Sequence, residues 1–127
     1  MDAADKEKIE KIIRDKKTAH SELNQNSSVY RAFLGLEEKA FAEGALTKRD
    51  KELIAVGISV VANCESCMEW HIHQALQSGA TYQQVIEAIE VGIEMGGGPA
   101  TVSARFALKA LEYHKNGKNI LSYCKCN

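Results

Sequence analysis

The stretch LIAVGISVVA, residues 53 to 62, decides the fold class of this chain. Its run ISVV, residues 58 to 61, is rich in β-branched residues, which are typical of a strand. No second strand-like segment exists to pair with it, and an unpaired strand would leave backbone N–H and C=O groups without hydrogen bonds. The stretch is therefore predicted to be a helix, and because it is apolar on every side, we expect this helix to be buried.

The segments on both sides of this stretch also show helical patterns, with apolar residues at helical spacing and residues typical of helix ends. Thr81 and Gln84, for example, form a capping-box pattern, and the glycines after Met95 end the helix that this box opens. The predicted helices run from Ala3 to Leu23, from the cap Ser28 to Gly44, from the cap Thr47 to Ala62, from Glu65 to Ser78, from the cap Thr81 to Met95, and from Pro99 to Asn116. The predicted fold is an all-α, single-domain helical bundle of about six helices spanning residues 1–127, with the tail 117–127 left unassigned.

The length and composition of the chain limit its class and its partners. Its 127 residues are enough for one hydrophobic core and too few for two comfortable domains. Sixteen basic and seventeen acidic residues give a net charge of −1, so charge gives no reason to expect nucleic acid or an anionic membrane as a partner. No apolar run approaches the roughly 18 to 20 residues of a membrane span, and the N-terminus is charged throughout, unlike a secretory signal. We therefore expect a cytoplasmic protein, whose four cysteines favour reversible thiol chemistry or metal binding.

The segment NCESCMEWHIH, residues 63 to 73, holds two of these cysteines, Cys64 and Cys67. Cys64 is predicted at the start of a helix and Cys67 in its first turn, where unpaired backbone N–H groups and the helix dipole favour the thiolate over the thiol. Residues three apart on a helix lie one turn apart on the same face, so the two sulfurs can form or break a disulfide with little backbone movement. The spacing therefore predicts a redox-active pair.

A histidine and a glutamate complete the predicted site. His71 follows Cys67 by four residues, which places both on one face of the helix, about 6 Å apart along its axis. An imidazole with a pKa near neutrality can take the thiol proton and return it later. If the chain reverses at Asn63, Glu52 lies level with His71, and a carboxylate there fixes the tautomer of the imidazole and stabilises its charged form. The predicted catalytic residues are Cys64, Cys67, His71 and Glu52.

Other residues of the same helix are predicted to lie outside this site. His73 would point about 240 degrees away from Cys67 around the helix axis. Glu69 would lie opposite Cys67 and is expected to be exposed. Three apolar residues, Met68, Trp70 and Ile72, are predicted to belong to the core or to a subunit interface.

Two other interpretations of the cysteines remain open. In the first, the pair binds a structural zinc ion together with His71 or His73 and with Cys124 or Cys126. In the second, the two thiols are small buried groups in a noncatalytic oligomeric scaffold. If the helical pair is redox-active, the tail cysteines Cys124 and Cys126 are either bystanders or an auxiliary relay that passes electrons to it.

The joint spacing of these residues resembles the signature of a known family. Glu52, eleven intervening residues, the segment Cys64-Glu65-Ser66-Cys67, three residues and His71 are similar to the motif of the alkyl hydroperoxidase D-like (AhpD-like) branch of the carboxymuconolactone decarboxylase family. The segment MGGGPA, residues 95 to 100, resembles the loop between later helices of that family. The resemblance covers about Gly44 to Leu111.

This resemblance implies an oxidoreductase without a bound cofactor, whose paired cysteines reduce small peroxides or disulfides. An external dithiol donor, of lipoyl or thioredoxin-like type, would return the electrons, and the subunits would assemble as homotrimers or homohexamers. The decarboxylase branch lacks the cysteine pair, so that activity is not expected. The peroxidase form has a second histidine just before the second cysteine, where this chain has Ser66. Because serine is no base near neutral pH, the resemblance favours thiol–disulfide exchange over peroxide turnover.

Overall fold

The computed structural model describes the backbone of residues 1–124 and the side chains of residues 1–115. The elements are α1 (Ala3–Asn26), α2 (Ser28–Phe41), α3 (Lys48–Val61), α4 (Glu65–Gln77), α5 (Tyr82–Gly96) and α6 (Gly98–Cys124). The described part of the chain contains no strand, so the prediction of an all-α fold with about six helices is confirmed. None of its helices is both long enough and apolar enough to cross a membrane.

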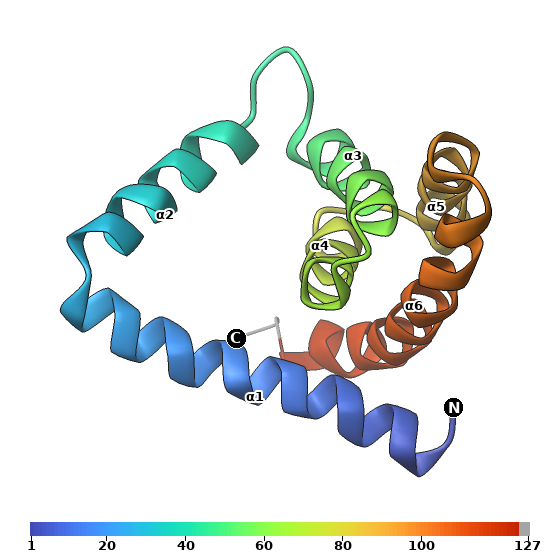
Figure 1. Ribbon diagram of the computed structural model, residues 1–127, viewed down its shortest axis with the longest axis horizontal. Helices are drawn as coiled ribbons and strands as arrows, with labels where there is room; N and C mark the ends of the chain where they lie inside the picture. Colours follow the sequence, from blue (N-terminus) through green and yellow to red (C-terminus); the bar gives the residue numbers. More distant parts are fainter. Residues whose placement is uncertain (125–127) are drawn as a thin grey trace.

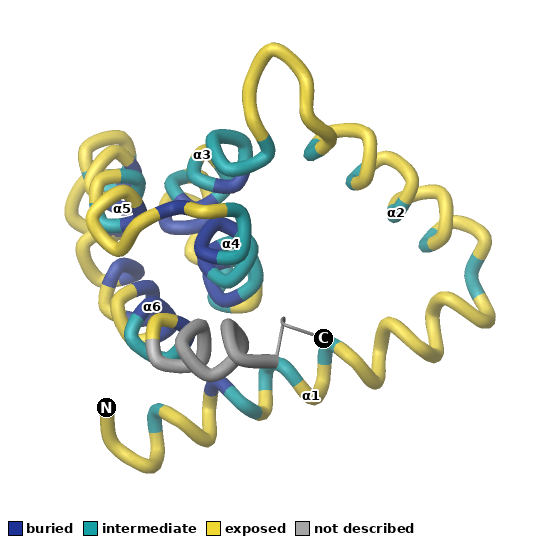
Figure 2. The backbone as a smooth tube through the Cα atoms, turned by 180° about the vertical axis from the view of Figure 1, so that it is seen from behind, coloured by how far each residue is buried: buried dark blue, intermediate teal, exposed yellow. Residues whose placement is uncertain are grey.

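Helices α3 to α6 form the body of the molecule, and α1 and α2 form an arm around one side of it (Figure 1). Within the body, α3 packs against α4 and α5, while α6 packs against α4 and α5 from the other side. Helix α1 lies along α6 and is anchored by Ile9, which is fully buried. Helix α2 contains no buried residue and touches the body through α3 and, at its end, through α4. Figure 2 shows this difference, with exposed residues along most of α1 and α2.

The hydrophobic core fills the space between α3, α4, α5 and α6. Its members are small and branched apolar side chains, with Met68 and Phe106 as the larger ones. Two members, Met68 and Ile72, were predicted as core or interface residues, and the core position of both is confirmed. The fully buried residues of the body include Val56, Val60, Met68, Ile72, Ala75, Ala80, Val85, Ala107, Ala110 and Leu111.

The prediction that the third helix is buried on every side is wrong for this single chain. Val56 and Val60 of α3 are fully buried, but Ile58 is 62% exposed and Ile54 and Val61 are also exposed. Helices α4 and α5 make the main contacts of α3, and α6 and α2 make smaller ones, but these contacts leave the three side chains exposed. An open apolar groove therefore runs between α3 and α5.

Most of the predicted helix ends are confirmed. The capping box of Thr81 and Gln84 is present at the start of α5, and α5 ends in the glycine run. Four ends differ from the prediction. Helix α1 continues to Asn26 instead of stopping at Leu23, and α2 ends at Phe41 instead of Gly44. The cap of α2 is Ser27, whose hydroxyl accepts from the Tyr30 N–H at 3.0 Å, rather than Ser28. Helix α6 continues to Cys124 instead of stopping near Asn116, since one glycine inside a helix costs only about 1 kcal/mol.

The turn between α3 and α4 places the cysteine pair. Asn63 adopts a φ of 53°, a left-handed conformation that asparagine tolerates better than most residues. Its side-chain oxygen accepts a hydrogen bond from the Ser103 hydroxyl of α6 at 2.9 Å. This contact ties the predicted reversal at Asn63 to the body and brings Cys64 to the first position before α4.

Candidate redox site

Cys64 and Cys67 are joined by a disulfide across the first turn of α4, with their Cα atoms 5.2 Å apart. Cys64 is the N-cap of α4, and its sulfur accepts a hydrogen bond from the Cys67 N–H at 3.2 Å. Both cysteines are half-buried, so the pair is packed on one side and reachable from the other. The predicted position of the pair and its ability to bond are confirmed.

The start of α4 also provides the electrostatic setting for a reactive thiol. Backbone N–H groups of the first helical turn have no partner within the helix and point towards the cap position. A thiolate at Cys64 or Cys67 would lie at this positive end of the helix, which stabilises its negative charge. The fold thus favours the form of cysteine that exchanges disulfides.

Glu52 and His71 form a direct hydrogen bond, as the hairpin geometry predicted. The His71 Nδ1 atom lies 2.7 Å from the Glu52 Oε1 atom. Glu52 is only 2% exposed, although it carries a charge. The contact between these residues is therefore confirmed, while their catalytic role stays a prediction.

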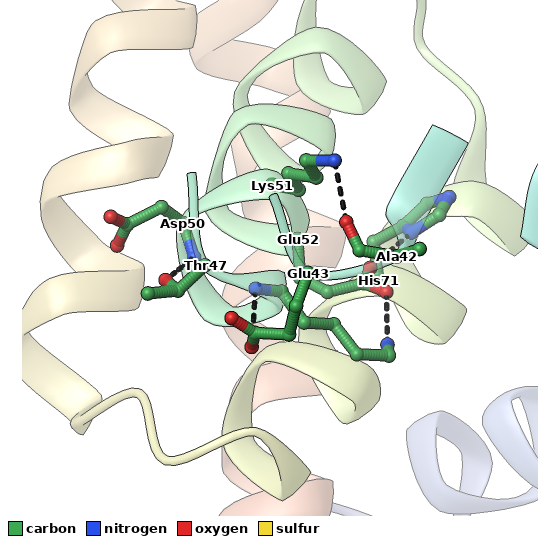
Figure 3. A network of polar contacts seen from close by, with 8 residues as sticks. Ala42, Glu43, Thr47, Asp50, Lys51, Glu52 and His71 are labelled. Carbon is green, nitrogen blue, oxygen red and sulfur yellow. Dashed lines mark hydrogen bonds and ion pairs between the residues drawn. The ribbon is translucent and has the colours of Figure 1, made fainter. Parts of the chain in front are cut away.

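The charge of Glu52 is stabilised by two hydrogen bonds. Figure 3 shows Glu52 and His71 within the polar network at the start of α3. Lys48, one turn earlier on α3, donates to the Glu52 Oε2 atom at 2.8 Å. Burial alone would raise the pKa of Glu52, but the hydrogen bonds from His71 and Lys48 outweigh it, so that the pKa lies below its usual value. Because an ionised carboxylate only accepts, Nδ1 of His71 carries a proton, and Nε2 is the ring nitrogen that can accept one.

The arm helix α2 also contributes to the site. Phe41, at the end of α2, stacks on the His71 ring with centroids 5.2 Å apart and planes 21° apart. The aromatic ring covers one face of the imidazole and limits its rotation. A cleft of about 300 Å³ opens beside this stack. Its lining consists of Glu37, Glu38, Phe41, Ala42, Lys48, Glu52, Trp70, His71 and Gln74.

Neither cysteine lines that cleft, so the structure presents the imidazole and the disulfide as neighbours on α4 rather than as walls of one pocket. His71 follows Cys67 by four residues within α4, which puts both side chains on one face of the helix. Proton transfer between His71 and Cys67 stays a prediction that rests on this spacing.

Lys48 and Phe41 were not predicted as site residues. Lys48 could have been predicted from the sequence as a partner of Glu52, because a lysine four residues before a glutamate on a helix is a common ion-pair spacing. Phe41 could not have been predicted as a site residue from the sequence. Its contact with His71 depends on the path of the connection between α2 and α3, which sets where α2 lies.

The predicted exposure of Glu69 is wrong. Glu69 is 2% exposed, and its Oε2 atom accepts from the His114 Nε2 atom of α6 at 2.7 Å. The prediction considered α4 alone, whereas α6 packs on the side of α4 opposite Cys67 and covers Glu69. His73, which was predicted to point away from Cys67, stacks on the same His114 with ring centroids 4.2 Å apart.

In the zinc interpretation, the thiolates of Cys64 and Cys67 would bind the ion. In the oxidised protein described here the two sulfurs are bonded to each other and provide no thiolate ligand. The side chains of Cys124 and Cys126 lie outside the described residues. Their predicted parts, as ligands, as an electron relay or as bystanders, stay predictions.

The chain belongs to the carboxymuconolactone decarboxylase family, whose family model matches residues 27–110. The six-helix fold is consistent with the AhpD-like branch of that family. Among sequence relatives, the uncharacterised protein 4 in the cox locus of Paracoccus denitrificans is 45% identical over 86 residues, which cover 68% of this chain and 78% of the relative. An uncharacterised protein of Cupriavidus necator is 38% identical over 110 residues, which cover 80% of this chain and 95% of the relative.

Two solved structures share the fold. A carboxymuconolactone decarboxylase family protein from Legionella pneumophila superposes with a TM-score of 0.79 and 30% identity, over 84% of this chain and 96% of that protein. A family protein from Thermotoga maritima, for which a part in an antioxidative response has been suggested, superposes with a TM-score of 0.78 and 22% identity. This second alignment covers 86% of this chain and 93% of that protein, and it is similarity of fold alone.

Proposed function

We propose that this protein is a thiol–disulfide oxidoreductase that reduces small disulfides through Cys64 and Cys67. The observation that carries the proposal is the disulfide at the start of α4, one helical turn before an imidazole that a buried carboxylate holds. Cys67 supplies the attacking thiolate, Cys64 resolves the intermediate, and His71 with Glu52 handles the proton.

In the reduced protein, the Cys67 thiolate attacks one sulfur of the substrate disulfide and forms a mixed disulfide. The other substrate sulfur leaves as a thiolate and takes a proton from the His71 imidazolium. The neutral His71 then takes the proton of Cys64, and the Cys64 thiolate attacks the Cys67 sulfur, which restores the internal disulfide. The second substrate sulfur leaves as a thiolate and takes up this proton from His71. Two electrons have moved from the protein to the substrate.

An external dithiol donor, such as a lipoyl group or a thioredoxin-like protein, returns these two electrons and becomes a disulfide itself. A hydroperoxide is the second substrate class. There, Cys67 would be oxidised to a sulfenic acid with release of an alcohol, and attack by Cys64 would release water and close the disulfide. Ser66 is exposed and offers no base at this step, so we expect slower turnover with hydroperoxides than with disulfides.

The proposal includes assembly into homotrimers or homohexamers through the groove between α3 and α5. The groove has a volume of about 670 Å³ and presents Ile58, Val91 and Met95, which is 73% exposed. An apolar surface of this extent on a small domain is typical of a subunit interface. We also expect the protein to work in the cytoplasm, where dithiol donors are abundant.

Trapping of the mixed disulfide tests the proposed roles of the two cysteines. Reduced Cys64→Ser protein, mixed with a small aromatic disulfide, should accumulate one substrate adduct on Cys67, as measured by peptide mass spectrometry. Removal of the resolving sulfur leaves this adduct without an internal route of release. An adduct that forms instead on Cys64 of the Cys67→Ser protein, with none on Cys67 of the first variant, would reverse the roles.

A further inference from the structure

Three ionisable side chains gather on the side of α4 that faces away from the disulfide. Glu69 and His73 belong to α4, one turn apart, and His114 belongs to α6. Glu69 and His114 are buried and His73 is half-buried. The Lys16 ammonium of α1 lies over the Trp70 ring and interacts electrostatically with Glu69. The proposed redox chemistry uses none of them.

Their ligand atoms lie close enough to converge on one ion. One nitrogen from each imidazole and one carboxylate oxygen all lie within 4.8 Å of one another. Ligands of a zinc ion, each about 2.0 to 2.2 Å from the metal, are separated from one another by roughly 3 to 3.5 Å. Small side-chain movements would therefore bring the three residues to bonding distance.

Glu69 gives an independent reason to expect a cation here. Its Oε2 atom accepts from His114, but its buried Oε1 atom has no hydrogen-bond partner among the described residues. A buried carboxylate oxygen without a hydrogen bond destabilises the fold, since it has lost its hydration, and the Lys16 ammonium interacts with Glu69 without bonding to this oxygen. A metal ion would satisfy this oxygen directly.

The present stacking of the two imidazoles defines the movement that binding requires. The planes of His73 and His114 differ by only 5°, with centroids 4.2 Å apart. An imidazole binds a metal in the plane of its ring, so two parallel stacked rings do not share one ion. One ring must turn about its Cβ–Cγ bond, and the half-buried His73 has more room to do so than the buried His114.

We propose that Glu69, His73 and His114 form a site for one divalent transition-metal ion of the zinc type, which ties α4 to α6. Two imidazoles and one carboxylate are a common ligand set for such ions, with a fourth position left for water. The site lies on the far side of α4 from Cys67 and differs from a zinc site built on the cysteines. An ion here would hold in place the helix that carries the redox pair.

Cobalt(II) titration of the oxidised full-length chain tests this site. For this titration both tail cysteines are replaced by serine (Cys124→Ser and Cys126→Ser), and the Cys64–Cys67 disulfide is kept. No free thiol then remains to bind the ion. Trp70 is the sole tryptophan of the chain, and its ring lies 6.3 Å from that of His73. Binding of one ion per chain should quench Trp70 fluorescence and produce the visible absorption of four-coordinate cobalt.

Single substitutions identify the ligands. His73→Gln and His114→Gln should each weaken cobalt affinity by about tenfold or more, because each removes one ligand. The matched control is His20→Gln, which changes an exposed histidine of α1 bonded to Tyr30 and should leave the affinity unchanged. If His114→Gln does not fold, His73→Gln still decides the question, since His73 is half-buried. Absence of quenching at millimolar cobalt, or equal affinity of His73→Gln and the parent protein, would overturn the proposal.

Discussion

Glu52 carries a negative charge in an almost fully buried position, and its two oxygens have different partners. Oε1 is bonded to His71 and Oε2 to Lys48. The carboxylate of Glu52 therefore sets the tautomer of His71, and the hydrogen bond from Lys48 favours the ionised form of Glu52. At the scale of single residues, the proposed chemistry depends on this chain of three side chains beside the cysteine pair.

Replacement of the Glu52 carboxylate by an amide should impair the imidazole without removing it. We expect Glu52→Gln to lower kcat/KM for disulfide reduction by about tenfold or more, because the amide does not stabilise the imidazolium. The measurement is kcat/KM for a small disulfide, compared with that of the unmodified chain at the same pH. Glu94→Gln, at an exposed position of α5, serves as the control. An unchanged kcat/KM in Glu52→Gln would remove Glu52 from the mechanism.

Lys16 should make the stability of the protein depend on pH above neutrality. Burial lowers the pKa of Lys16 from an ordinary 10.5 to about 8, and its ammonium lies over the Trp70 ring at 3.0 Å from the centroid. Between about pH 8 and 10.5 the unfolded chain binds more protons at this lysine than the folded protein does, so the free energy of unfolding should rise with pH over that range. Urea unfolding at pH 7.5 and 9.5 measures this rise.

Lys16→Met removes the titrating group and keeps much of its apolar length, so it is the comparison for that experiment. The variant should show a smaller rise in unfolding free energy between the two pH values than the parent protein. Equal rises in both proteins would show that Lys16 does not cause the effect.

Helices α3 and α5 approach each other closely because both carry a glycine at the contact. A Cβ atom on Gly92 would lie 2.7 Å from the Gly57 carbonyl oxygen and 3.1 Å from the Val60 Cβ. We expect Gly92→Ala to lower the free energy of unfolding by about 1 to 3 kcal/mol, since the helices must separate. Gly35→Ala in α2, where a Cβ meets nothing within 4 Å, should instead raise it by about 0.5 to 1 kcal/mol. Urea denaturation of both variants measures these changes. A change of the same sign in the unfolding free energy of both variants would contradict the close packing of α3 on α5.

At the scale of elements, local signals in the sequence were sufficient for most of the fold. The capping box of Thr81 and the turn at Asn63 were both predictable from local sequence. A hydrogen bond from Ser103 of α6 to Asn63 adds a distant contact to that turn. The pairing of Glu52 with His71 followed from the hairpin that this turn creates. The pairing of Glu69 with His114 could not be predicted in this way, because the two residues lie 45 positions apart and meet only through the packing of α4 on α6.

The same limit applies to the exposure of α3. Its apolar surface was visible in the sequence, but the sequence pattern did not tell a face covered by the same chain from one left open. The structure assigns Val56 and Val60 to the core and Ile58 to the open groove. Only the arrangement of α4 and α5 around α3 decides between these positions.

At the scale of the whole molecule, the open groove should be covered by another subunit. We expect Val91→Glu, in the groove, to shift the protein to monomers, because assembly would bury the introduced charge. Multi-angle light scattering after size exclusion measures the mass. Val102→Glu, at an exposed valine of α6 outside the groove, is the matched control and should keep the assembly. A Val91→Glu protein with the mass of the parent protein would place the interface elsewhere.

The most direct measurement of the redox mechanism is steady-state disulfide reduction by Cys67→Ser with a dithiol donor. The reference is the Cys124→Ser, Cys126→Ser protein, which retains the helical pair. We expect Cys67→Ser to lose more than about 1,000-fold in kcat/KM, because it lacks the attacking sulfur, while the reference keeps the rate of the unmodified chain. Equal rates for Cys67→Ser and the unmodified chain would contradict the mechanism.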